Sequence, residues 1–99
     1  MRLALVMMYR TEIKPDKLVQ MDALREEFMD IYEKHDVDVI GHWRENKASH
    51  ISYYMARYEN EDDYTKTVLK LHEDQRYREL TARLNEIRTD FEATRLTPV

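Results

Sequence analysis

Leu3-Ala4-Leu5-Val6-Met7-Met8-Tyr9, seven apolar residues in succession, decides the fold of this chain. A β-strand covered on one face alternates apolar and polar residues, because successive side chains point to opposite sides of the sheet. This stretch does not alternate, so we expect a first strand that is covered on both faces. A short chain supplies about one layer of helices, enough for one face. We therefore expect a second copy of the chain to cover the other face.

The remaining pattern alternates between helical and extended segments. Leu18, Met21, Leu24, Phe28 and Ile31 recur at helical spacing, which predicts one buried helical face. The expected elements after the first strand are a helix that starts at residues 14–17 and ends near 34–35, strands at 37–43 and 51–58, helical segments capped by Asn60 and Asp74, and a strand at 91–96. This order predicts an α+β, ferredoxin-like β-α-β-β-α(α)-β fold. Four antiparallel strands form its sheet, helices cover one face, and residues 1–99 form a single domain.

Composition excludes several classes of function. The chain has 99 residues, a formal net charge of −4 and no cysteine. Both signs of charge are interspersed, so no basic patch for nucleic acid is expected. No apolar run approaches the length of a membrane span, and the absence of cysteine is compatible with a cytoplasmic location. The sequence contains no glycine-rich phosphate loop and no convincing third ligand beside its histidines, so neither a cofactor nor a metal site is expected.

Two histidines are the first candidates for chemistry. If the hairpin turn lies at residues 46–48, Arg44 faces His50 and His42 faces Ser52. These four side chains and Tyr54 then share one face of the sheet, where diagonal neighbours are in reach of one another. Such a group suits an acidic or phenolic substrate, with His42 and Tyr54 as catalytic residues and Arg44 and His50 as ligand-binding residues. The alternative is that these polar residues lie at the mouth of a barrel or along a dimer interface.

Aromatic residues supply the other candidates. Tyr9 and Trp43 are expected to line a cavity, because their rings suit both pocket walls and interfaces. Gly41, the only glycine, lies within an expected strand. Such a glycine indicates close approach of another group to the backbone, which would be a ligand beside Trp43, a bulky core residue or the partner strand.

Several short motifs resemble those of the dimeric α+β barrel proteins, and among them the NIPSNAP family. They are Glu12-Ile13-Lys14-Pro15-Asp16-Lys17, Ile40-Gly41-His42-Trp43, the tyrosine-rich stretch 53–58, His72-Glu73-Asp74-Gln75-Arg76-Tyr77 and Arg95-Leu96-Thr97-Pro98. The resemblance covers nearly the whole chain. It implies a homodimer whose two sheets form a barrel, with a small-molecule pocket in each subunit.

Three functions are compatible with this pattern. The first is a NIPSNAP-like homodimer that binds a small, partly apolar ligand. The second is a cofactor-independent monooxygenase or isomerase that acts on a small phenolic or acidic substrate. The third is an interaction module whose dimer surface is its whole function. A shared fold does not decide among them, so function has to be argued from the site.

Overall fold

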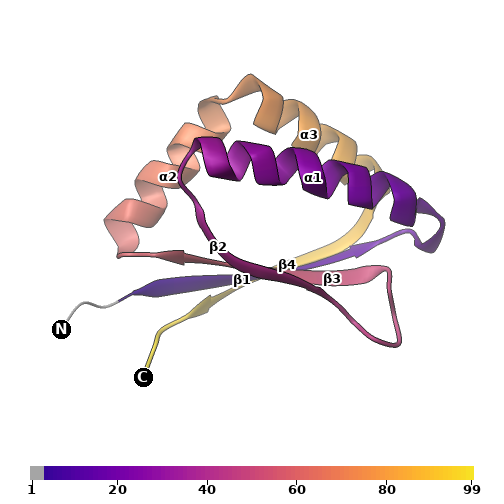
Figure 1. The fold of residues 1–99 in the computed structure, drawn as a ribbon, viewed down its shortest axis with the longest axis horizontal. Coiled ribbons are helices and arrows are strands. Elements are labelled where there is room, and N and C mark those ends of the chain that lie inside the picture. Colours follow the sequence, from indigo (N-terminus) through magenta and orange to yellow (C-terminus); the bar gives the residue numbers. More distant parts are fainter. Residues whose placement is uncertain (1–3) are drawn as a thin grey trace.

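A computed structural model describes residues 4–99 and contains one four-stranded antiparallel sheet, with strand order β2-β3-β1-β4. Its elements are β1 (Leu5–Ile13), η1 (Pro15–Lys17), α1 (Leu18–Lys34), β2 (Asp38–Arg44), β3 (Ile51–Tyr58), α2 (Glu61–Glu73), α3 (Gln75–Ile87) and β4 (Arg88–Leu96). All three α-helices lie on one face of the sheet, and the other face is uncovered (Figure 1). The predicted α+β, ferredoxin-like fold is confirmed.

The first strand presents different residues to its two faces. Leu5, Met7 and Ile13 are buried, as expected for side chains that point toward the helices. Val6 and Met8 have the opposite parity and are half-buried on the uncovered face. Both faces of β1 are therefore apolar at its start, although Leu3 lies outside the described residues. The strand also runs to Ile13, four residues past Tyr9, because Thr11 and Glu12 continue to pair with β3 and β4.

The helices begin and end where the sequence predicts. Asn60 caps α2 by accepting a hydrogen bond from the backbone N–H of Asp63, at 2.8 Å. Asp74 caps α3 through the backbone N–H of Arg76, at 2.9 Å, and its extended backbone separates α3 from α2. The core between helices and sheet includes Phe28, Ile31, Leu71, Leu80 and Leu84. None of the helices between residues 4 and 99 has both the length and the apolar character that a membrane crossing requires.

The β2–β3 hairpin differs in register from the predicted one. His42 pairs with Tyr54 and Arg44 with Ser52, so the predicted pairing of His42 with Ser52 was wrong by two residues. The connection is longer than three residues, and it leaves His50 before the start of β3. A shift of two residues preserves the face of each side chain. His42, Arg44, Ser52 and Tyr54 therefore still share one face.

The only glycine makes room for a tryptophan. A Cβ atom on Gly41 would lie 3.0 Å from the Cζ2 and Cη2 atoms of Trp43. The two residues are two positions apart on one strand and so share a face. The close neighbour is thus the exposed indole of Trp43 itself, which is neither a ligand, a core residue nor the partner strand.

Candidate functional site: an aromatic cavity between the sheet and the helices

A cavity of about 130 Å³ lies between the helix-facing side of the sheet and the helices. Its walls come from every layer of the fold: β1, β2, β3 and β4 below, and α1, α2 and α3 above. The lining residues are Tyr9, Thr11, Met21, Arg25, Phe28, Tyr32, His42, Ser52, Tyr53, Tyr54, Tyr58, Val68, Leu71, Tyr77, Thr81, Leu84, Arg88 and Phe91. The walls are mainly aromatic and apolar with a few polar groups, which is the usual character of a small-molecule site.

A row of stacked rings crosses the floor of this cavity. Tyr9 stacks on Tyr54 with ring centroids 4.6 Å apart, and Tyr54 stacks on His42 at 5.4 Å. On its other side, Tyr9 stacks on Phe91 of β4 at 6.0 Å. The pairing of Tyr9 with Tyr54 and of Tyr54 with His42 across adjacent strands brings the rings together. The structure thus joins three of the predicted site residues, Tyr9, His42 and Tyr54, in one row.

Two tyrosine hydroxyls meet at the centre of the site. The hydroxyl of Tyr32, on α1, lies 3.2 Å from the hydroxyl of Tyr54, on β3. Burial raises the pKa of Tyr54 well above its ordinary value, and burial likewise raises the pKa of Tyr32. Both phenols are therefore protonated at neutral pH, where they act as hydrogen-bond donors and acceptors.

The imidazole of His42 is neutral at physiological pH. Burial is the main cause that lowers the pKa of His42 below its ordinary value of 6.5, and the nearby positive charge of Arg25 is the second cause. Its Nε2 atom lies 2.9 Å from the sulfur of Met29 on α1. A neutral imidazole beside a cavity can accept a proton or a hydrogen bond.

Charged residues surround the end of the cavity near His42. Arg25 Nη1 donates to Asp22 Oδ1 at 2.8 Å, and Arg44 forms an ion pair with the same carboxylate. The hydrogen bond from Arg25 and the contact with Arg44 lower the pKa of Asp22. Arg44 shares the face of His42, but its guanidinium binds Asp22 on the surface and does not line the cavity.

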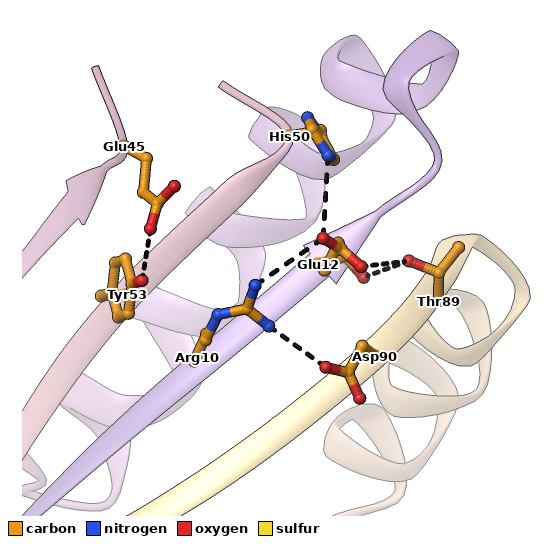
Figure 2. Close-up of polar contacts among 7 residues, drawn as sticks. All are labelled: Arg10, Glu12, Glu45, His50, Tyr53, Thr89 and Asp90. Atoms are coloured by element: carbon orange, nitrogen blue, oxygen red, sulfur yellow. Dashed lines mark hydrogen bonds and ion pairs between the residues drawn. The ribbon is translucent and has the colours of Figure 1, made fainter. Parts of the chain in front are cut away.

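Besides Arg44, two more of the predicted site residues lie away from the cavity. Trp43 is on the uncovered face of the sheet and is 49% exposed. His50 lies at the end of the hairpin loop, where its Nε2 is 3.8 Å from Glu12 Oε1. Figure 2 shows the surroundings of His50. Neither residue lines the cavity that holds His42 and Tyr54.

His50 belongs to a cluster of charged and polar side chains on the uncovered face of the sheet. The other members of this cluster are Arg10, Glu12, Thr89 and Asp90. Arg10 contacts Asp90 at 3.1 Å and Glu12 at 3.7 Å, and the hydroxyl of Thr89 donates to the backbone carbonyl of Glu12 at 3.3 Å (Figure 2). A hydrogen bond with Tyr53 is the main cause of the raised pKa of Arg10. These contacts tie the ends of β1, β3 and β4 together.

The sequence reasoning missed several residues of the cavity, notably Arg88 and Phe91. Arg88 starts β4, three residues earlier than the predicted strand, and Phe91 lies opposite Thr11 of β1. Phe91 and Ala93 alternate with polar residues in β4, and this alternation was the signal that could have placed Phe91 on the helix-facing side. Arg88 gave no such signal, because charged residues are common in edge strands. Within residues 4–99, no group of three His, Cys, Asp or Glu side chains has the arrangement of a metal site.

No protein-family model and no curated protein matches this chain. Its fold, in contrast, is similar to several solved structures. A NIPSNAP family protein from Agrobacterium tumefaciens superposes with a TM-score of 0.88 at 26% identity, over 97% of this chain and 86% of that one. An uncharacterised NIPSNAP domain protein from Burkholderia xenovorans gives a TM-score of 0.85 at 18% identity, over 96% and 94% of the two chains.

A structure from another functional class is also similar. A proposed antibiotic biosynthesis monooxygenase from Bacteroides thetaiotaomicron has a TM-score of 0.77 at 15% identity, over 97% of this chain and 90% of that one. Likeness at this identity concerns the fold. The comparisons therefore show that this chain has a NIPSNAP-like fold.

Proposed function

We propose that this protein is a cytoplasmic, NIPSNAP-like homodimer that binds a small, partly apolar ligand in the cavity of each subunit. The observation that carries the proposal is the aromatic cavity of about 130 Å³. An apolar cavity of about 150 Å³ in another protein accommodates benzene, so a cavity of this size suits a ligand with a single ring.

The polar groups of the cavity suit a ligand that is only partly apolar. Thr11, Ser52 and Thr81 place hydroxyls on its walls, and His42 adds a neutral imidazole. A few polar groups among aromatic walls fix the orientation of a ligand, while the apolar area supplies affinity.

Pairing of two copies through the uncovered face of the sheet is the second part of the proposal. All three α-helices cover the opposite face (Figure 1), and Val6, Met8 and Met55 lie half-buried on the uncovered one, beside Trp43. A second copy that covers this patch by a two-fold axis removes apolar surface from water. The same face carries both Arg10 and Glu12, so opposite charges are available to a partner of identical sequence.

Native mass spectrometry tests the assembly. The expected mass is twice the 12.1 kDa of one chain. Met8→Lys, on the uncovered face, should give monomers, because it places a charge in the centre of the interface. Val19→Lys is the matched control, because Val19 is 80% exposed on α1, and it should remain dimeric. A monomeric wild-type protein would refute the homodimer.

Filling the cavity tests ligand binding. NMR chemical shifts of the protein, titrated with p-cresol as the probe, should change at Tyr9, Tyr54 and other lining residues. Leu84→Phe adds volume at a buried lining position and should abolish these changes, whereas Leu69→Phe, at a 58% exposed position on α2, should preserve them. Val68→Phe is a second filling variant if Leu84→Phe does not fold. Unchanged wild-type spectra at millimolar p-cresol would refute the site.

The lowered pKa of His42 favours one alternative, a cofactor-independent monooxygenase or isomerase that acts on a small phenolic or acidic substrate. His42 would take the proton of a phenol through Nδ1, because Nε2 contacts Met29, and Tyr54 would hold the substrate by its hydroxyl. Loss of turnover in His42→Gln with retained binding would favour this alternative. Trp43→Phe, on the other face of the sheet, is the control that should retain turnover.

A further inference from the structure

One charged group of the cavity lacks an acidic partner. Arg25 and Arg88 are the two arginines among the lining residues, and Arg25 is paired with Asp22. Arg88 is half-buried, and its Nη2 donates to the amide oxygen of Asn85, which is neutral. Within the described part of the chain, no carboxylate lies within ion-pair distance of Arg88. A partly buried guanidinium without a counter-charge provides a site for an anion.

The guanidinium of Arg88 lies at the end of the aromatic row. Its Cζ atom is 4.4 Å from the centroid of the Phe91 ring, and Phe91 stacks on Tyr9 at 6.0 Å. Phe91 is 44% exposed, so this end of the aromatic row lies at the surface. A ligand there can contact the guanidinium and the adjacent rings together.

We infer that the ligand is a single-ring aromatic carboxylate, whose carboxylate binds Arg88 and whose ring packs against Tyr9 and Phe91. This inference rests on the proposed binding function and names its ligand class. The planar guanidinium presents a fork of N–H donors that matches both oxygens of a carboxylate. The aromatic row provides the stacking surface for the ring, and the size of the cavity limits the ligand to about one ring. Burial also lowers the pKa of Arg88, which is the expected effect on a cation without an acidic neighbour.

The test compares benzoate with benzamide, which has nearly the same shape and no charge. Calorimetric titration of the wild-type protein should give a benzoate affinity about ten to a hundred times that of benzamide, the range for a charge-assisted hydrogen-bonded pair. Arg88→Gln should reduce the affinity for benzoate to that for benzamide and leave the affinity for benzamide unchanged. Arg88→Lys, which keeps the charge but not the fork, should retain an intermediate affinity for benzoate.

Arg95→Gln is the matched control. Arg95 is also an arginine of β4 that lies over an aromatic ring, with its Cζ 5.1 Å from the centroid of Tyr64, but it is outside the cavity and pairs with Glu61. This variant should bind benzoate as the wild type does. Circular dichroism confirms that each variant folds.

The outcomes separate this inference from the proposed function. Equal affinities for benzoate and benzamide, with no effect of Arg88→Gln, would overturn the role of Arg88 and leave the cavity as a site for neutral ligands. Failure of benzoate, benzamide and p-cresol alike to bind would overturn the ligand-binding function, and this inference with it.

Discussion

The hydroxyl oxygens of Tyr32 and Tyr54 lie 3.2 Å apart, and this contact joins helix α1 to strand β3 beside the cavity. Tyr32 is buried, so its hydroxyl depends on this partner for a hydrogen bond. The pair fixes the ring of Tyr54 between Tyr9 and His42, and thereby orients the wall against which a ligand would pack.

Removal of both hydroxyls should destabilise the protein by less than the sum of the two single removals. Tyr54→Phe leaves the Tyr32 hydroxyl without its partner, which should lower the free energy of unfolding by about 1–2 kcal/mol. Tyr32→Phe should have a similar effect. The double variant should cost less than the sum by about 1 kcal/mol, because no polar atom is then left unpaired. Urea denaturation of the four proteins measures this coupling, and strictly additive changes would contradict the contact.

His42 should make the fold sensitive to mild acid. Its pKa in the folded protein is lowered from 6.5, so the unfolded chain binds a proton more readily than the folded one. The free energy of unfolding should therefore fall as the pH decreases through 6.5 toward the lower pKa of the folded protein. Well above pH 6.5, His42 should have no effect on the free energy of unfolding. His42→Gln should reduce that slope between about pH 7.5 and 5.5, as measured by urea denaturation.

Leu69→Gln, at a 58% exposed position on α2, provides the control for this effect, because it changes no titratable group. It should leave the slope of the wild type unchanged. Equal slopes in the wild type and in His42→Gln would show that burial does not hold His42 neutral.

Asp74 should govern stability at lower pH. Its carboxylate lies 2.9 Å from His35 Nε2 and 3.0 Å from Lys34 Nζ. The hydrogen bond from His35, and after it the one from Lys34, holds the pKa of Asp74 far below 3.8. A lowered pKa means that this stabilisation is present above pH 3.8 and is lost as the pH falls below it. Asp74→Asn keeps a good helix cap but carries no charge.

Circular dichroism between about pH 5 and 2 measures this difference. Asp74→Asn should be less stable than the wild type at pH 5, and its stability should decline less steeply on acidification. Parallel acid-unfolding curves of the two proteins would contradict the role of the Asp74 charge.

Gly41 and Trp43 should show coupled effects on stability. Gly41→Ala places a Cβ 3.0 Å from the indole and should shift the fluorescence of Trp43, the single tryptophan of the chain. In a Trp43→Ala background the same substitution should stabilise the strand by about 0.5–1 kcal/mol, because alanine loses less backbone entropy on folding than glycine. The same effect in both backgrounds would show that the indole does not restrict position 41.

Much of the fold follows from local pattern. The boundaries of β3, the caps Asn60 and Asp74 and the buried face of α1 agree with the predictions, because each depends on residues close in sequence. The face of β1 that packs on the helices could not be predicted. Leu5 and Met7 on one side are no more apolar than Val6 and Met8 on the other, so only tertiary packing decides between them.

The candidate site was harder to predict than the fold. His42 and Tyr54 were placed together because a register error of two residues preserves their shared face. Trp43 and His50 were not, since one lies on the opposite face and the other in a loop whose length the turn residues did not reveal. Arg88 enters the cavity only through the pairing of β4 with β1, a contact between residues about 75 positions apart in the chain.

The cavity lies on the helix-facing side of the sheet, away from the face through which we propose that two copies pair. In a homodimer that pairs through the opposite face of the sheet, no residue of one subunit would line the cavity of the other. Occupancy of one site would then alter the other only through a change in the sheet itself. We therefore expect titrations to reveal two equivalent sites per dimer, with a Hill coefficient of about one.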